Sequence, residues 1–399
     1  MNIITSLFLI LIVTVWLRFF VIFSLVLYDA LQKNKKITNT KDQPSLDEVT
    51  ILIPAYQEEN TIEKTLRSAE NLIAYGAKLI LVDDGSSDKT LEKLSAFLQK
   101  NKNTHLIRHE TNQGKALALN SGLQAVKTSL VLTLDADTSV EISAVQAAVE
   151  SLLNASQPEQ AAVVAFDVRV ARSEQLFREL QALEYDASLN FERRGQSMLS
   201  AISVAPGAAS LWKTAALNQI SGFSNTTVTE DVDATLKLAA IGQRTLHCPK
   251  AEAFTGTPMT FSQLMAQRRR WCLGHYQNIP RHVKSLGKDL TFTSLTYPNF
   301  LLLSAFMPFM LLLSLITLFA DSGTWKNTLS FLTIFWLFTI YLQRWIALRI
   351  INRKTNLIAF LTEPFSTLFF HFCAMTITLF ALVKIGLGIK QDIWSSRAR

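Results

Sequence analysis

Two aspartates separated by a single residue, Asp135 and Asp137, directly follow the apolar run Leu130–Leu134. Residues i and i+2 of an extended segment share one face, so both carboxylates can reach one ligand. Mg²⁺ and Mn²⁺ prefer oxygen donors, and substrate phosphates often complete their coordination shells. The pair therefore suggests a metal site for a diphosphate group, although a solvated turn after a strand is the commoner meaning of this spacing alone.

Two further apolar runs also end in polar residues. The residues after these runs are Asp83 and Asp84 in one case, and Ala55, Tyr56 and Glu58 in the other. In a parallel sheet, ligands bind outside the carboxyl ends of the strands. We therefore expect three strand ends to converge on one crevice, in which Asp83 and Asp84 can hydrogen-bond a base or a ribose.

Lys115 stands at the start of a helical pattern, directly after Asn112-Gln113-Gly114. Gly114 permits a tight approach of the backbone, and Lys115 can meet a phosphate at the helix N-terminus. The spacing does not match Gly-x-x-x-x-Gly-Lys-Ser/Thr, and no Gly-x-Gly-x-x-Gly follows the first strand. Both absences argue against an ATPase and against a dinucleotide-dependent enzyme.

Thr229, Glu230 and Asp231 precede another helical pattern. As a structural feature they form an N-terminal cap with acids that the helix dipole favours. As a functional feature, Asp231 is a general base that deprotonates a hydroxyl nucleophile.

The segment Gln267-x-x-Arg270-Trp271 has two open interpretations. It is either a basic stripe on a helix at a membrane surface or a binding segment. In the second case Arg270 binds a diphosphate, and the flat indole of Trp271 stacks on the apolar face of a sugar ring. The apolar residues around it fit one helix face, which predicts an amphipathic interface region over 261–290.

The elements that must position these residues alternate along the chain. Short apolar runs predict strands, and the patterns between them predict helices. The predicted strands are 49–53, 78–82, 105–108, 130–134 and 162–170, and the predicted helices are 59–74, 88–99, 115–125 and 174–193. This alternation predicts an α/β fold with a mainly parallel, doubly wound sheet over residues 49–260. The strands are apolar throughout, as expected when helices cover both faces.

Both ends of the chain are rich in apolar residues. A bilayer core needs about 20 apolar residues per helix. Residues 1–30 are therefore predicted to form one transmembrane helix, and residues 295–388 about three. Residues 31–48 are a polar linker and 389–399 a tail. Lysines after the first helix favour a cytoplasmic central domain on the inner (plasma) membrane of a bacterium.

Two charged features of these ends are left open by the sequence. Arg18 lies near the middle of the first apolar segment, where a charge is costly in lipid. It is either buried against other helices or faces a polar path. Three C-terminal crossings would put the tail outside, whereas its basic residues prefer the cytoplasmic side.

Composition argues against several classes of site and partner. The 399 residues carry a formal net charge of +7, with 49% hydrophobic and 18% charged residues. Much of the basic charge flanks apolar segments, and no helix-turn-helix, zinc-ligand or RNP pattern supports nucleic-acid binding. Cys248, Cys272 and Cys373 form no Cys-x-x-Cys pair, so we expect neither a disulfide framework nor a zinc site. A reducing, cytosol-facing domain fits.

Each motif is weak alone, but their order is specific. The series is Asp83-Asp84-Gly85, Asp135-Ala136-Asp137, Thr229-Glu230-Asp231 and Gln267-x-x-Arg270-Trp271. With this series the chain resembles the processive family 2 glycosyltransferases, over residues 49–280. That family includes cellulose, chitin, hyaluronan and poly-N-acetylglucosamine synthases. Glu184-Tyr185 and the segment 112–120 are similar to the hyaluronan and poly-N-acetylglucosamine branch.

The resemblance implies a GT-A fold and the transfer of a sugar, N-acetylglucosamine by preference, from a UDP donor to a growing polysaccharide with inversion. The implied nucleotide-sugar-binding residues are Ala55, Tyr56, Glu58, Asp83, Asp84, Lys115 and Asp135. The implied ligands of Mg²⁺ or Mn²⁺ are Asp135 and Asp137, and the implied base is Asp231. The residues implied to bind the pyrophosphate and the acceptor are Glu230, Gln267, Arg270 and Trp271.

Two departures from the family pattern lie near the expected sugar pocket. Phe166-Asp167 lacks the glycine that usually precedes the aspartate, and Gly207-Ala208 stands within a segment that differs from the usual Ser-Gly-Ala. The identity of the donor sugar therefore stays open. The C-terminal membrane part is also short, which leaves open whether one chain forms a complete secretion channel.

Several partners and two other functions remain in view. Besides the UDP-sugar and the polysaccharide, the expected partners are membrane lipid and either an accessory membrane subunit or a second copy of the chain. One alternative function is a non-processive transferase that adds a single sugar to a lipid carrier. The other is an inactive transport or scaffold subunit.

Overall fold

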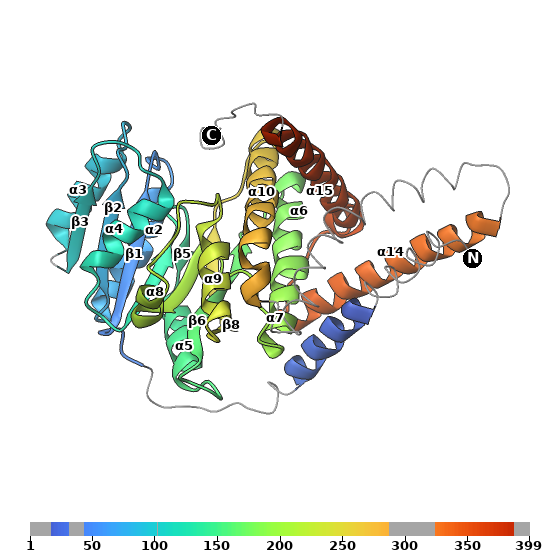
Figure 1. Ribbon diagram of the computed structural model, residues 1–399, viewed down its shortest axis with the longest axis horizontal. Helices are drawn as coiled ribbons and strands as arrows, with labels where there is room; N and C mark the ends of the chain where they lie inside the picture. The colour runs from blue at the N-terminus through green and yellow to red at the C-terminus, as the bar shows by residue number, and fades with distance from the viewer. Residues whose placement is uncertain (1–16, 32–43, 102, 287–323, 387–399) are drawn as a thin grey trace.

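The computed structural model describes residues 17–31, 44–101, 103–286 and 324–386 (Figure 1). The first half of the predicted N-terminal helix, most of the linker, the first of the three C-terminal segments and the tail lie outside the described residues.

One eight-stranded sheet forms the centre of the described chain, in the order β3-β2-β1-β4-β7-β6-β8-β5. The strands are β1 (Val49–Ala55), β2 (Lys78–Asp83), β3 (Thr104–Arg108), β4 (Leu130–Leu134), β5 (Ser139–Val140), β6 (Ala161–Val170), β7 (Ala209–Lys213) and β8 (Arg244–Thr255). Strands β1 to β4 pair in parallel, whereas β7 runs antiparallel to both β4 and β6. The α/β prediction is confirmed. The first half of the sheet is parallel as predicted, and the second half is mixed.

β1 is buried along its whole length because helices cover both faces of the sheet. Ile51 and Ile53 pack with α2 (Ile62–Ala74), and Leu52 packs on the opposite face with α4 (Lys115–Ala125). This two-sided burial explains why the strands are apolar runs in the sequence. The remaining helices of this part are α3 (Thr90–Lys100), α5 (Ile142–Leu153), α8 (Thr214–Gln219) and α9 (Glu230–Ala240).

The helix predicted over 174–193 is interrupted by a wider turn. In order, its parts are α6 (Leu176–Glu184), the π-helix η1 (Tyr185–Leu189) and α7 (Asn190–Met198). Gln343, on α14 (Thr324–Ile350), donates a hydrogen bond to the Ala187 carbonyl of this turn at 3.2 Å. The π-helix is therefore the point at which a much later helix docks.

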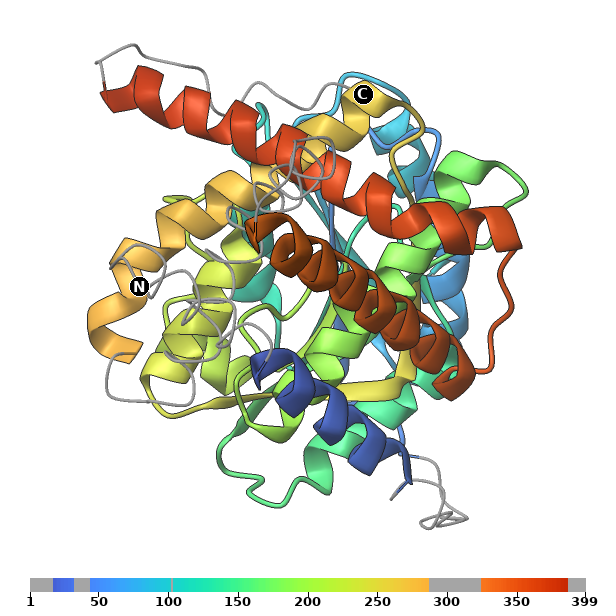
Figure 2. The same cartoon turned by 90° about the vertical axis from the view of Figure 1, so that its right-hand side faces the viewer.

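A second layer of helices lies beside the sheet (Figure 1). α10 (Phe261–Leu286) packs against α9 and α15 (Leu357–Gly386), and α15 also packs against α6. Figure 2, which views the molecule from the side of these outer helices, shows α14, α15 and the helix at 17–31 in front of the sheet. In the part of the chain that the structure describes, no helix is long and apolar enough to cross a membrane.

Two ion pairs fix the helix at 17–31 to α7. Arg18 lies 2.6 Å from a carboxylate oxygen of Glu192. Asp29 lies 2.6 Å from the guanidinium of Arg194. Of the two explanations for Arg18, burial against another helix is the one observed, since only 8% of this residue is exposed.

Candidate active site

Lys115, the first residue of α4, is the centre of a half-buried cluster of charges from distant parts of the chain. Its ammonium lies 2.5 Å from a carboxylate oxygen of Asp135 and 3.2 Å from one of Glu230. It also donates a hydrogen bond to the Gly207 carbonyl at 3.4 Å. Burial disfavours the charged lysine, but the acids, which include Asp231, outweigh burial and raise the pKa of Lys115. The lysine therefore stays charged and joins the end of β4 to the start of α9.

Asp231, the second residue of α9, faces the same cluster. One carboxylate oxygen accepts a hydrogen bond from the Gly207 N–H at 2.9 Å, and the other accepts one from the Val232 N–H at 2.9 Å. Burial, aided by the charge of Glu230, raises the pKa of Asp231 to about 6 against the opposing effect of Lys115. Burial also opposes the charge of Glu230, but Lys115, Arg270 and hydrogen bonds together outweigh it and lower the pKa of Glu230. Glu230 is thus the counter-ion of the lysine, and Asp231 is suited to accept a proton near neutral pH.

Asp137 lies two residues after Asp135 and is half-buried. Its Oδ1 accepts hydrogen bonds from the hydroxyls of Thr138 and Thr255, at 3.1 and 3.3 Å. Gly256 leaves room beside the other oxygen, since a methyl group there would come within 3.0 Å of Oδ2. Burial and the charge of Asp135 raise the pKa of Asp137 to about 6.

The donor atoms of Asp135 and Asp137 suit a hard divalent cation. All of them are oxygens, which Mg²⁺ and Mn²⁺ prefer, and both ions commonly take further ligands from water and phosphate. No group of three or more His, Cys, Asp or Glu side chains able to hold a metal occurs among the residues described. Two carboxylates with a substrate diphosphate therefore fit such an ion, and Asp135 would share its oxygens with Lys115.

The two aspartates at the end of β2 have different surroundings. Asp84 accepts hydrogen bonds from the backbone N–H groups of Gln113, at 2.9 Å, and Gly114, at 2.8 Å. It also lies 2.7 Å from Nδ1 of His109. Asp83 is fully buried, and its Oδ1 has no hydrogen-bond partner in the described chain. Asp84 therefore fixes the loop before α4, whereas Asp83 keeps one buried acceptor atom without a partner in the described chain.

Ala55, Tyr56 and Glu58 lie at the end of β1, beside the end of β2. Parallel pairing sets Ala55 directly opposite Asp83. Glu58 is close enough to Asp137 for its charge to raise the pKa of that carboxyl, although burial is the larger cause. The structure thus brings the predicted nucleotide-binding residues to one edge of the sheet.

α10 approaches the site from the side of α9. Burial opposes the charge of Glu230, and Arg270 is, with Lys115, among the cations that outweigh burial and lower its pKa. Gln267, one turn before Trp271, has a buried Oε1 without a hydrogen-bond partner among the residues described. Of the predicted acceptor-side residues on α10, Arg270 therefore lies close to Glu230, which directly precedes Asp231.

Arg268, which no sequence pattern singles out, lies beside Trp271. Its guanidinium lies 2.5 Å from Glu184 Oε2 and 4.2 Å from the ring centroid of Trp271. The Tyr185 ring lies 6.5 Å from the same indole. A buried arginine that is paired and covers a ring fixes that ring, so Arg268 holds the Trp271 indole and covers one of its faces. In the sequence, the only feature that marks Arg268 is its position next to Gln267. A basic stripe on the helix surface explains that position equally well.

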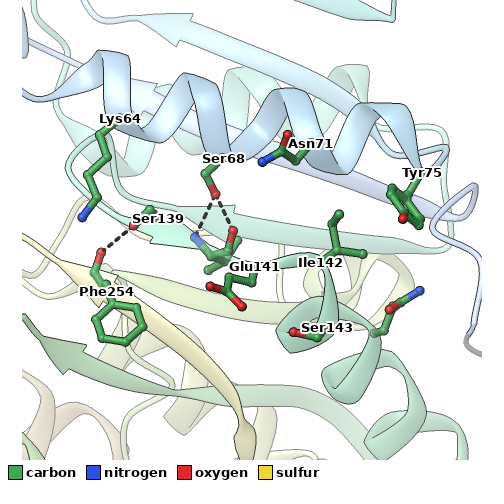
Figure 3. Close-up of a pocket in the computed structure, with 11 residues that line it drawn as sticks. Lys64, Ser68, Asn71, Tyr75, Ser139, Glu141, Ile142, Ser143 and Phe254 are labelled. Carbon is green, nitrogen blue, oxygen red and sulfur yellow. Dashed lines mark hydrogen bonds between the residues drawn. The ribbon is translucent and has the colours of Figure 1, made fainter.

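A cleft of about 710 Å³ opens beside α2 and β5 (Figure 3). Its walls include Lys64, Tyr75, Glu141 and Phe254. Ser68, on α2, donates to the Val140 carbonyl at 2.5 Å and accepts from its N–H at 2.9 Å. None of the predicted site residues, all of which are described, lines this cleft. Its walls show how α2 holds the segment that follows Asp137.

Comparison with known proteins gives the family of the central domain. Residues 50–220 match the model of Glycosyl transferase family 2. This part of the chain is therefore similar to family 2 glycosyltransferase domains. The resemblance expected from the motifs is therefore confirmed, and the matched range ends before α9, so Asp231 and α10 lie outside it.

The chain is also similar to two curated proteins and a solved structure. Over 259 residues the chain is 30% identical to a Poly-beta-1,6-N-acetyl-D-glucosamine synthase of Staphylococcus aureus, covering 65% of this chain and 61% of that protein. Over 248 residues it is 28% identical to the synthase of the same name from Staphylococcus epidermidis, covering 62% and 59%. The chain thus spans about three fifths of the length of these curated relatives. A solved structure, the mannosyltransferase PcManGT from Pyrobaculum calidifontis in complex with GDP-Man and Mn²⁺, is similar with a TM-score of 0.48 and 16% identity, over 84% of this chain and 98% of that one.

Proposed function

We propose that this chain is an inverting, processive glycosyltransferase that adds sugars from a UDP donor to the end of a β-linked polysaccharide. The observation that carries this proposal is the half-buried cluster in which Asp231, with a pKa of about 6, lies beside Lys115 and Asp135. The name of the staphylococcal relatives supports N-acetylglucosamine as the sugar.

In this reaction Asp231 removes the proton from the acceptor hydroxyl. The oxygen of that hydroxyl attacks the anomeric carbon of an α-linked UDP-sugar. The bond from that carbon to UDP breaks, and the new linkage is β. The Gly207 N–H orients the Asp231 carboxylate, at 2.9 Å. Lys115 balances the charge of the neighbouring acids, and Arg270 offers a planar set of donors to the diphosphate.

The metal role of the two aspartates is part of the same proposal. When bound, Mg²⁺ or Mn²⁺ would supply electrostatic stabilisation of the departing diphosphate. Asp137 and Asp135 would hold it. Thr138 orients Asp137 through a 3.1 Å hydrogen bond, and Lys115 orients Asp135.

The nucleotide would bind at the ends of β1 and β2. The free Oδ1 of Asp83 can accept a hydrogen bond from an N–H of the base. Ala55, Tyr56 and Glu58 lie alongside, since Ala55 pairs with Asp83. Asp84 contributes through the loop that it holds.

The acceptor would bind along α10, at Gln267 and Trp271, on the cytoplasmic side of a bacterial inner membrane. Large apolar side chains on the outer helices support contact with lipid, because a soluble surface rarely exposes them together. Phe20 is 46% exposed, Phe338 60% and Phe369 54%.

The test is a panel of UDP-sugars assayed for UDP release from membranes that contain the full chain, with and without Mn²⁺. We expect metal-dependent release that is fastest with UDP-N-acetylglucosamine, and long products by mass spectrometry. If the products carry only one added sugar, processive synthesis is wrong and the chain transfers a single sugar to a carrier. UDP binding without turnover of any donor would support an inactive subunit.

A matched pair of variants tests the metal ligand. Asp137→Ala is expected to abolish metal-dependent release of UDP. Glu141→Ala removes a nearby carboxylate that lines the cleft beside α2, and we expect it to leave release unchanged. Equal rates in the two variants would remove Asp137 from the site.

A further inference from the structure

Thr229 occupies the N-cap position of α9, directly before Glu230 and Asp231. A threonine at this position usually accepts a hydrogen bond from one of the first N–H groups of its helix. Here the side chain makes no such bond within α9. Its Oγ1 instead accepts a hydrogen bond from Asn278 Nδ2, on α10, at 3.1 Å. The cap residue of the helix that carries the base is therefore tied to another helix.

Thr229 contacts α10 at Asn278 and Gly274. Asn278 is 1% exposed, and its Nδ2 also donates to the Gly274 carbonyl, one turn earlier, at 2.9 Å. A methyl group at Gly274 would come within 2.2 Å of Thr229 Oγ1. A residue without a side chain at 274 thus lets the two backbones approach until Thr229 reaches Asn278.

Other hydrogen bonds flank this contact. The Val228 N–H donates to Gln277 Oε1 at 2.9 Å. Beyond the contact, His282 Nε2 lies 2.9 Å from Asp233 Oδ1. Because residues three and four apart share a helix face, one face of α10 holds the chain on both sides of Asp231.

The same helix carries the predicted acceptor-binding residues. Trp271 precedes Gly274 by one turn, and Gln267 precedes it by two. Asp231 follows Thr229 within the first turn of α9. The length of α10 between these residues therefore sets the distance from the base to the acceptor. That distance matters because a displacement of about 1 Å can cost about 10²-fold in rate.

We propose that Asn278, acting through Thr229, is a positioning residue that fixes Asp231 relative to the acceptor-binding side chains of α10. Gly274 permits the contact. This inference rests on the proposed function and names how its site holds the base. Since Asn278 acts on the base and not on the nucleotide, its loss lowers kcat and leaves the KM for the UDP-sugar unchanged.

The test compares Thr229→Val, which keeps the shape but removes the accepting oxygen, with Thr229→Ser, which keeps that oxygen. Thr50→Val is the matched control, because the Thr50 hydroxyl makes a buried 2.6 Å hydrogen bond with Thr128 at the end of β1 away from the site. UDP release from the full chain in membranes gives kcat and KM. We expect Thr229→Val to lower kcat by roughly 10–100-fold at unchanged KM, with Thr229→Ser and Thr50→Val within about twofold of wild type.

Two results would overturn the positioning role. One is a wild-type kcat in Thr229→Val. The other is an equal fall of kcat in Thr50→Val, which would attribute the loss to any missing buried hydroxyl bond. Gly274→Ala gives a second route, since the added methyl group is expected to push Thr229 away and lower kcat in the same manner.

A measurement without turnover separates this inference from the proposed function. If wild-type protein releases UDP from no donor, the proposed function fails. Hydrogen–deuterium exchange over residues 226–233 then tests the contact itself. Faster exchange in Thr229→Val than in Thr229→Ser supports it, and equal exchange in the two overturns it.

Discussion

Adjacent acidic residues stand on both sides of the candidate active site, and the two pairs are stabilised in opposite ways. Asp84, at the end of β2, accepts hydrogen bonds from neutral backbone N–H groups at 2.8 and 2.9 Å. Glu230, at the start of α9, is held by the full charge of Lys115 at 3.2 Å. The first arrangement holds a loop in place, and the second balances several charges in a half-buried cluster.

Because Asp84 and Glu230 are stabilised differently, their neighbours Asp83 and Asp231 differ in the chemistry that they can perform. Asp83 keeps a buried oxygen without a hydrogen-bond partner in the described chain, which suits binding. Asp231 has a pKa raised to about 6 by burial and by Glu230, which suits proton transfer. Changes at the end of β2 should therefore act on stability and nucleotide affinity, and changes at the start of α9 on rate.

The largest expected effect is at Asp231. Asp231→Asn keeps the size of the side chain and can still accept from the Gly207 N–H, but it cannot take a proton. Turnover of the UDP-sugar should fall by about 10²–10⁴-fold, while UDP affinity, measured by calorimetry, stays at the wild-type value. Glu230→Gln is the matched change beside it and should cost less, because the base remains. Polymer formation at the normal rate by Asp231→Asn would mean that another group is the base.

The next effect in size is at Lys115. Lys115→Met leaves the half-buried carboxylates of Asp135 and Glu230 without their cation. Removing one partner of a fully buried ion pair typically costs about 3–5 kcal/mol. Solvent screens these half-buried charges, so we expect a smaller but clear fall in the unfolding temperature as well as in turnover. Lys115→Arg keeps the charge and should lose less of both. An unfolding temperature of Lys115→Met equal to that of wild type would show that the lysine does not stabilise this side of the site.

A smaller effect separates the two aspartates at the end of β2. Asp84→Asn has one accepting oxygen in place of two, so one backbone N–H of the loop before α4 loses its partner. This should lower the free energy of unfolding by about 1–3 kcal/mol. Asp83→Asn should leave the unfolding temperature near wild type and weaken UDP binding. Thermal unfolding and UDP titration of both variants test this difference. If Asp83→Asn lowers stability and Asp84→Asn weakens UDP binding, Asp83 holds the loop and Asp84 binds the nucleotide.

The residues at the strand ends could be predicted because local sequence determines them. Asp83 and Asp135 each follow an apolar run, and in a parallel sheet such runs end at the ligand-binding edge. Lys115 follows a glycine at a helix start, as predicted. The structure places all of these at one edge, which the alternation of strands and helices already implied.

The contacts between distant segments could not be predicted in this way. β7 is five residues long, and its antiparallel direction is set by pairing with β4 and β6. Thr229 has the sequence pattern of a helix cap, yet its hydroxyl bonds Asn278, which no local pattern marks. Arg268 looks like one more residue of a basic stripe, yet it is buried on Glu184. Each of these depends on which surfaces meet after folding.

The smallest expected effect is on pH dependence, and it tests the electrostatic side of the comparison directly. Because the pKa of Asp231 is raised from 3.8 to about 6 in the folded protein, kcat/KM should fall about tenfold per pH unit below that value. The raised value also means that folding favours the protonated acid, so Asp231 lowers stability as the pH rises from 3.8 to about 6.

Variants of the two acid pairs should differ in the pH dependence of kcat/KM. Glu230→Gln removes a charge that raises the pKa of Asp231, and it releases Lys115 to act on that aspartate. Both changes have the same sign, so the acidic limb of kcat/KM should move to lower pH. Asp83→Asn, at the other pair, should leave the limb in place even where it weakens binding. A limb that stays unmoved in Glu230→Gln would show that burial alone raises the pKa of the base, and that the adjacent acids at the start of α9 act as independently as those at the end of β2.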